Sequence, residues 1–369
     1  MARRHKTLIF HIGDHKTGST SIQLAFAQRQ ITLKNQSVFY PAKLASNALK
    51  PHFKAYAKPS SHPAHGRAIK AFKSLARRIR NADADFCLIS AEAFEGVDAT
   101  ALHNIVTTFF AGAADEIRII AYVRPHAARI MSSFAERVKV GSQRVIEGGP
   151  RIVFDQMFRE NIFPYQARFS ALREQFGTAF LLRPMIQSQL VNGSVVDDFI
   201  HHAFAAPEFR RTGPGTANES LDLESLMRLN ILHTQCQNHP QKLRLTLGWE
   251  FARVAASLPP LENSTRPRLH KTLAHGIHAA CLADARAVDQ QFFGAAPLLE
   301  TELHNALKGA VDTAQSIKPA DYLPPSEIRS LTILSKMIST MLENQNGDWQ
   351  GFLHSQRLAD VRANTVAGN

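Results

Sequence analysis

The chain has 369 residues, 44% of them hydrophobic and 20% charged, so it can form one large or two smaller globular units and is too apolar for a disordered chain. Lys and Arg number 43 against 31 Asp and Glu, a formal net charge of +12 that favours an anionic partner. Its three widely spaced cysteines argue against a disulfide framework or a zinc site and favour a reducing compartment.

The N-terminal stretch predicts no targeting segment. The apolar run over residues 7–12 is too short for the core of a signal peptide, and no small-residue cleavage site follows it. No run approaches the ~18–20 apolar residues that span a bilayer. We therefore expect a soluble, cytoplasmic protein without a transmembrane segment.

Short apolar runs alternate with amphipathic segments through the first half of the chain, a pattern typical of a parallel α/β sheet. The expected strands cover residues 7–12, 38–40, 86–90, 117–123 and 180–183. The expected helices between them cover about 19–33, 66–82, 99–110 and 126–140.

Strand signals stop after residue 183. Residues 205–217 are rich in Pro, Gly and Arg and predict a linker or surface loop. Helical patterns then cover about 219–236, 246–258, 269–292, 298–314 and 325–344, and weak periodicity from about 356 predicts a fraying tail. We predict a three-layer, P-loop-like α/β core over residues 1–205 and a mainly helical region over 206–369, packed on the core as one unit.

The sharpest motif follows the first expected strand, where residues 11–21 read His-Ile-Gly-Asp-His-Lys-Thr-Gly-Ser-Thr-Ser before a helical pattern. A strand that leads through a glycine-containing turn into a helix presents backbone N–H groups to an anion. Gly13 and Gly18 keep the Gly-x-x-x-x-Gly spacing of the nucleoside-triphosphate P-loop, but that motif places Lys directly after the second glycine. Here Ser19 takes that position, and the lysine is Lys16.

A second motif follows the fourth expected strand, which ends in Arg124 and Pro125, with Ser132 eight residues after Arg124 on the next expected helix. An arginine at the carboxyl end of a parallel strand lies on the edge where ligands bind in open α/β sheets. Its guanidinium can bind a phosphate bidentately while a serine adds a hydroxyl donor. By itself, this pattern would fit equally well an arginine that ends a strand and a serine on a polar helix face.

Together the two motifs resemble those of sulfotransferases that use 3′-phosphoadenosine 5′-phosphosulfate (PAPS), especially the bacterial branch whose loop reads His-Ile-Gly-x-x-Lys-Thr-Gly-Thr-Thr. The resemblance covers roughly residues 7–235, without the Arg-Lys-Gly loop that completes the 3′-phosphate site in many cytosolic members. It implies a 5′-phosphosulfate site formed by Lys16, Thr17, Gly18, Ser19 and Thr20. It also implies that Arg124 and Ser132 bind the 3′-phosphate.

Sulfuryl transfer develops charge on the leaving oxygen and needs a base for the proton of the acceptor. Lys16 is the expected catalytic residue that neutralises the charge on the leaving oxygen, and with a lysine in that role no metal is required. Glu92, which leaves the strand 86–90 in Ser-Ala-Glu, is the best candidate for the base and matches a Ser-x-Glu of the bacterial relatives. Alternatively, Ser90 caps a short helix there and Glu92 only favours its N-terminus. His15, inside the loop, is the next candidate.

The expected reaction is sulfuryl transfer from PAPS to a hydroxyl, or less readily an amino group, of a carbohydrate or glycolipid, with no nucleic-acid partner. Two other interpretations stay open. A P-loop kinase or other nucleoside-triphosphate enzyme would place Ser19 on Mg²⁺ and use Glu92 in a Walker-B-like role, but the displaced lysine counts against it. The other is an inactive nucleotide- or glycan-binding module. The sequence leaves the identity of the acceptor and the oligomeric state open.

Overall fold

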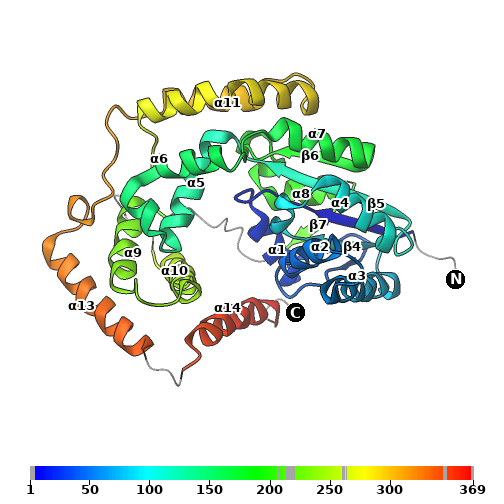
Figure 1. The fold of residues 1–369 in the computed structure, drawn as a ribbon, viewed down its shortest axis with the longest axis horizontal. Helices are drawn as coiled ribbons and strands as arrows, with labels where there is room; N and C mark the ends of the chain where they lie inside the picture. The colour runs from blue at the N-terminus through cyan, green and yellow to red at the C-terminus, as the bar shows by residue number, and fades with distance from the viewer. Residues whose placement is uncertain are drawn as a thin grey trace.

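The computed structural model describes residues 5–205, 208–212, 221–259, 262, 264–343 and 347–366. A parallel sheet formed by the first half of the chain lies between helices, and helices of the second half lie beside it (Figure 1). This arrangement confirms the predicted α/β class with a central parallel sheet and helical layers.

The central sheet has five parallel strands in the order β3-β4-β1-β5-β6. Their bounds are β1 Thr7–His11, β3 Val38–Phe39, β4 Phe86–Ser90, β5 Glu116–Val123 and β6 Phe180–Pro184, and every end lies within one residue of the expected one. Thr7 of the central strand β1 lies opposite Phe86 of β4 on one side and Glu116 of β5 on the other. All residues of β1 and β4 are buried, as expected for parallel strands covered on both faces.

Alternate strand residues point to opposite faces of the sheet and pack into two clusters. Ile9 of β1 belongs to a cluster shared with α1 (Ser19–Ala27) and α8 (Val195–Ala203). Phe10 of β1 belongs to the larger cluster on the opposite face. The helices that contribute to this larger cluster include α2 Lys50–Tyr56, α3 Pro63–Asn81, α4 Ala99–Ile105, α5 His126–Lys139, α6 Gln143–Arg159 and α7 Tyr165–Phe176. Burial on both faces holds the loops at the strand ends on a rigid frame.

The first helix ends earlier than predicted. The sequence predicts a helix over 19–33, but α1 stops at Ala27, and β2 (Ile31–Leu33) pairs antiparallel with β7 (Phe209–Arg211). Arg29 has a φ of 54°, a left-handed conformation that a helix does not continue through. β7 falls in the predicted linker 205–217, of which residues 206, 207 and 213–217 lie outside the described part of the chain. Because this pairing joins distant segments, no local pattern indicates it.

The second half is mainly helical, as predicted. Its helices are α9 Leu223–Gln235, α10 Gln241–Ala256, α11 Lys271–Phe292, α12 Leu298–Lys308, α13 Pro325–Leu342 and α14 Trp349–Val366. The last of these corrects the expectation of a fraying tail, since α14 is helical through residue 366 and contacts both α10 and α1. Within the described residues, every helix is too short or too polar to cross a membrane.

Helix α5 connects the two halves of the chain, because α9, α10, α11 and α12 all contact it. Gly248 of α10 lies so close to the C-terminal end of α5 that a Cβ would come within 1.6 Å of the carbonyl oxygen of Lys139. Nε2 of His233 in α9 also forms a hydrogen bond with that oxygen, at 2.9 Å. Only a glycine at position 248 lets the backbone of α10 come this close to Lys139, and this contact places α10 beside the last turn of α5.

Candidate functional site

The carboxyl ends of β1, β4 and β5 meet at one edge of the sheet because the three strands are parallel neighbours. Residues 12–18 follow β1, the short 3₁₀ helix η2 (Glu92–Gly96) follows β4, and Arg124 follows β5. From β1 the chain continues to β3, on one side of β1 in the sheet, whereas from β4 it continues to β5, on the other side. The strand order therefore reverses next to β1. Ligands of open α/β sheets bind at such a point.

The loop over residues 12–18 leads into an N-terminus of α1 that no side chain in the described part of the chain caps. Gly18 occupies the N-cap position with a φ of 80°, and a Cβ there would come within 2.8 Å of Val195 in α8. The Thr17 hydroxyl donates to the carbonyl oxygen of Asp14 at 2.6 Å and closes the turn. Ser19 is 2% exposed, and its Oγ has no hydrogen-bond partner among the described residues. Together with Thr20 in the first turn of α1, these groups suit an anion.

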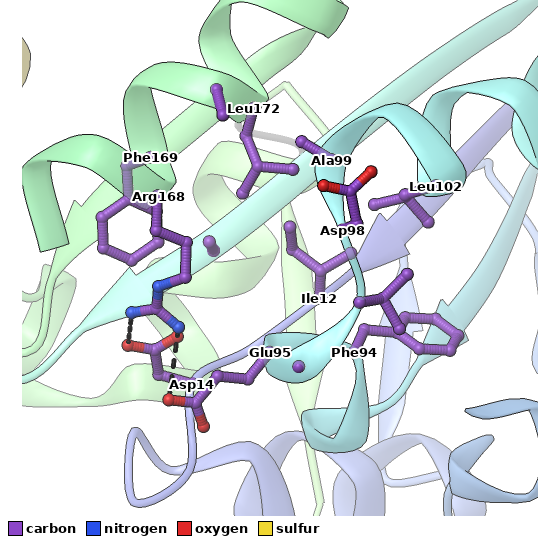
Figure 2. Close-up of a pocket in the computed structure, with 14 residues that line it drawn as sticks. Ile12, Asp14, Phe94, Glu95, Asp98, Ala99, Leu102, Arg168, Phe169 and Leu172 are labelled. Carbon is purple, nitrogen blue, oxygen red and sulfur yellow. Dashed lines mark hydrogen bonds and ion pairs between the residues drawn. The ribbon is translucent and has the colours of Figure 1, made fainter. Parts of the chain in front are cut away.

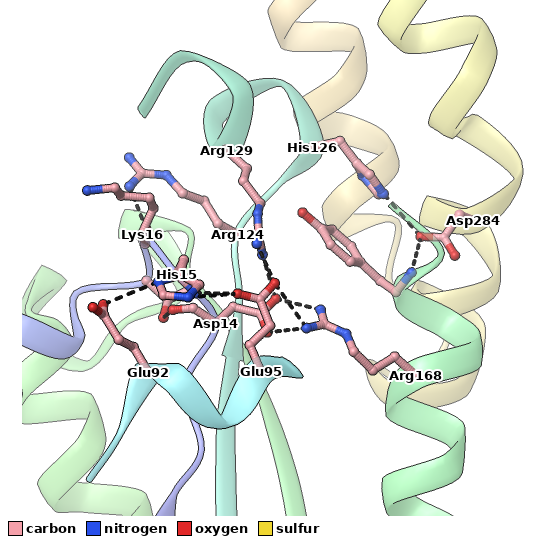
Figure 3. A network of polar contacts seen from close by, with 12 residues as sticks. Asp14, His15, Lys16, Glu92, Glu95, Arg124, His126, Arg129, Arg168 and Asp284 are labelled. Atoms are coloured by element: carbon pink, nitrogen blue, oxygen red, sulfur yellow. Dashed lines mark hydrogen bonds and ion pairs between the residues drawn. The ribbon is translucent and has the colours of Figure 1, made fainter. Parts of the chain in front are cut away.

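Arg124 connects the two motifs found in the sequence. Its Nη1 donates to the carbonyl oxygen of Lys16 at 2.6 Å and to Oγ of Ser132 in α5 at 3.2 Å. In Figure 3 the side chains of Arg124 and Lys16 lie alongside each other. The structure therefore brings the predicted residues of the loop and of the Arg-Ser pair to one place.

The Lys16 ammonium, by contrast, contacts a residue that no sequence motif indicates. Nζ lies 2.8 Å from Oε2 of Glu136 in α5, and Nζ of Lys139 lies 2.5 Å from the same oxygen. Nε1 of Trp249 in α10 donates to Oε1 of Glu136 at 3.2 Å. Glu136 and Lys139 are three residues apart in the sequence, a spacing that places both on one face of a helix. No local pattern connects this pair to Lys16 or to Trp249.

Glu92 lies where the sequence places it, directly after β4 at the carboxyl edge. Its Oε2 lies 3.7 Å from Nδ1 of His15, and its side chain is 32% exposed. Contact with His15 outweighs burial and lowers the pKa of Glu92, while the same contact raises the pKa of His15. Glu92 is therefore an ionised carboxylate that a partly exposed imidazole can orient.

Ser90 does not cap η2, contrary to the alternative role that the sequence allowed. The N-cap position is Ala91, without a side-chain cap. The Ser90 hydroxyl lies beneath the loop, 2.8 Å from Nδ1 of His11, and accepts from Nε2 of Gln23 at 3.2 Å. Burial lowers the pKa of His11 to about 4, so its ring is neutral at pH 7.

An ionic cluster formed by the buried Asp14 and Arg129 and the partly exposed Glu95 and Arg168 fixes the first half of the loop. Arg168 of α7 donates to both carboxylate oxygens of Asp14 at 2.7 Å, and Arg129 of α5 donates to Oδ2 at 2.8 Å. Both arginines also pair with Glu95, which in turn accepts from the backbone N–H of His15 (Figure 3). Each carboxylate pairs with both arginines, so removing one member would leave a net charge in a mostly buried place. The four together hold the loop, η2, α5 and α7 in one arrangement. No sequence signal beyond the presence of Asp14 in the motif pointed to it.

A cavity of about 300 Å³ lies beside this ionic cluster (Figure 2). Asp14, Glu95 and Arg168 form one wall, and their charges are already paired with one another. The remaining wall is mostly apolar and includes Ile12, Phe94, Val97, Leu102, Phe169 and Leu172. The cavity lies between η2, α4 and α7, on the same edge of the sheet as Glu92.

No protein-family model matches the chain, and neither does any curated protein or any solved structure. Among the described residues, no group of three or more His, Cys, Asp and Glu side chains could hold a metal ion.

Proposed function

We propose that this protein is a P-loop-like sulfotransferase that binds PAPS at the carboxyl edge of its sheet and transfers the sulfuryl group to a hydroxyl acceptor, such as a carbohydrate or glycolipid. The observation that carries the proposal is the position of Arg124, whose Nη1 contacts both Lys16 and Ser132. Two motifs separated by about a hundred residues of sequence would then form one binding site for a nucleotide with two phosphate groups.

The residues present fit such a donor. Among the described residues, no side chain caps the N-terminus of α1 and none bonds to the buried hydroxyl of Ser19, and both features suit the oxygens of a 5′-phosphosulfate. Arg124 and Ser132 supply a guanidinium and a hydroxyl for a 3′-phosphate. The formal net charge of +12 favours a polyanionic ligand in general.

The same residues can support in-line transfer, in which the acceptor oxygen bonds to sulfur while the bond from sulfur to the phosphate oxygen breaks. Bound PAPS would supply the sulfuryl group and a phosphate leaving group. The Lys16 ammonium can neutralise charge on the leaving oxygen, and the loop N–H groups can stabilise it further. The Glu92 carboxylate, which is ionised at neutral pH, lies at the same edge and can accept the proton of the acceptor hydroxyl.

The direct test is incubation of the purified protein with PAPS labelled in its sulfuryl group and a panel of hydroxyl and amino acceptors. We expect transfer of the label to a saccharide or glycolipid hydroxyl, in the presence of EDTA as in its absence. ATP labelled in its γ-phosphate serves as the matched donor. Transfer of phosphate that depends on a metal ion would favour a kinase, and binding of PAPS without any transfer would favour an inactive module.

A further inference from the structure

The Lys16 ammonium is held by a carboxylate on α5. Oε2 of Glu136 contacts Nζ of Lys16 at 2.8 Å and Nζ of Lys139 at 2.5 Å. In Figure 3 the Lys16 side chain extends away from Asp14 and Glu95. The catalytic cation of the proposed reaction is therefore already engaged by an anion of the protein itself.

Glu136 keeps other partners when Lys16 leaves. Lys139 remains on Oε2, and the Trp249 indole N–H remains on Oε1 at 3.2 Å. Burial opposes the charge of Glu136, but the nearby ammonium groups outweigh it and lower its pKa to about 2, so the carboxylate stays ionised. The side chains of Lys16 and Glu136 are 27% and 23% exposed. Because both reach solvent and Glu136 keeps its other partners, moving Lys16 leaves no buried charge unpaired.

The backbone of Lys16, in contrast, is fixed. Its carbonyl oxygen accepts from Arg124 at 2.6 Å, and its φ of 71° is uncommon for a residue with a side chain. Only the flexible four-carbon side chain is free to change partners. An anion in the loop would lie close to the base of that side chain and would compete with Glu136 for the ammonium.

We propose that Glu136 is a positioning residue that competes with the bound anion for Lys16, and thereby sets the anion affinity of the loop. Without an anion, Glu136 holds the ammonium at α5. With an anion, Lys16 moves to it, and Glu136 stays with Lys139 and Trp249. This inference rests on the proposed function only in requiring that the loop binds an anion, and it assigns a role to α10 through Trp249.

The test is a double-mutant cycle read by calorimetry, with 3′-phosphoadenosine 5′-phosphate and pyrophosphate as probes at fixed ionic strength. Glu136→Gln should bind either probe about fivefold more tightly than wild type, the upper range for a partly exposed ion pair. In a Lys16→Ala background, the same change should alter affinity by less than about twofold, because the two residues then no longer interact. Glu147→Gln, an exposed glutamate on α6, removes the same charge elsewhere and should leave affinity unchanged.

Unchanged or weaker binding by a folded Glu136→Gln, while wild type binds the probes, would overturn the inference and leave the proposed function intact. So would equal tightening in both backgrounds, which would indicate a general field effect. A wild type that binds neither probe would overturn the proposed function as well.

If Glu136→Gln fails to fold, nitrogen-15 spectra of the lysine side chains in the wild-type protein test whether Lys16 changes partner. On addition of pyrophosphate, the Lys16 Nζ signal should shift and the Lys139 signal should move much less, and a stationary Lys16 signal would refute the exchange.

Discussion

The carbonyl oxygen of Lys16 accepts a hydrogen bond of 2.6 Å from Nη1 of Arg124, 108 residues later in the chain. Lys16 belongs to the loop after β1, and Arg124 follows β5, the parallel neighbour of β1. The bond orients the guanidinium between the loop and Ser132, and it also holds Lys16 in its left-handed backbone conformation. One arginine therefore contributes both to the shape of the loop and to the proposed phosphate site.

Replacing Arg124 with alanine should weaken binding of 3′-phosphoadenosine 5′-phosphate at least ~10-fold, because hydrogen bonds to charged groups contribute about 1.5–3 kcal/mol each. Isothermal titration calorimetry measures the loss. Arg151→Ala is the matched control, since Arg151 is an exposed arginine of α6 paired with Asp155. ATP binding as tight as that of the 3′-phosphorylated nucleotide would contradict the assignment.

Replacing Lys16 with alanine should reduce turnover by ~10²–10³ and affinity far less, because in the proposed reaction the charge that Lys16 neutralises develops in the transition state. Steady-state and single-turnover rates with labelled PAPS separate the two effects. Lys34→Ala is the control, because Lys34 pairs with Glu208 at the surface. An equal loss in both quantities would indicate ground-state binding instead.

Replacing Glu92 with glutamine should lower turnover by roughly 10²–10⁴, the usual contribution of a positioned base. Gln keeps the size of the side chain, so nucleotide affinity and melting temperature should stay close to wild type. Rates under conditions in which chemistry limits turnover provide the measurement. A variant that retains more than about a tenth of the rate would move the role to another residue, with His15 the nearest.

The pH dependence of activity should respond to His15. Contact with His15 lowers the pKa of Glu92, so its carboxylate stays ionised to low pH. If Glu92 is the base, as proposed, activity should fall only as pH drops through that lowered pKa. His15→Gln removes the contact and should raise the pKa of Glu92, which moves the acid limb of the kcat/KM profile to higher pH. An acid limb that stays in place would show that Glu92 does not set it.

Gly248→Ala should destabilise the fold by about 3 kcal/mol or more, because overpacking against backbone cannot be relieved by a rotamer change. The added Cβ would come within 1.6 Å of the carbonyl oxygen of Lys139. Gly66→Ala in α3 is the matched control, since nothing lies within 4 Å of its Cβ position, and it should stabilise the protein by about 0.4–1 kcal/mol. Thermal melts measure both effects. A Gly248→Ala variant that melts at the same temperature as wild type would contradict the docking of α10 on α5.

The amino-acid sequence by itself determined the strands of the central sheet and the loop after β1. Strands such as 86–90 are buried on both faces, so they appear as short apolar runs bounded by polar segments. The loop motif is equally local, because its turn and the following helix depend on neighbouring residues. Glu92 could be placed at the carboxyl edge for the same reason, since the end of a strand fixes the position of the residues directly after it.

Only the tertiary structure decided which charged residues meet at that edge. The pairs Lys16 with Glu136 and Asp14 with Arg168 lie 120 and 154 residues apart, and they exist because the strand order brings the loop beside α5 and α7. The pairing of β2 with β7 was hidden in the same way, since both segments look locally like a helix end and a linker. Local propensity depends on neighbours in the chain, whereas ion pairs depend on how the helices pack against the sheet, and no periodicity records that packing.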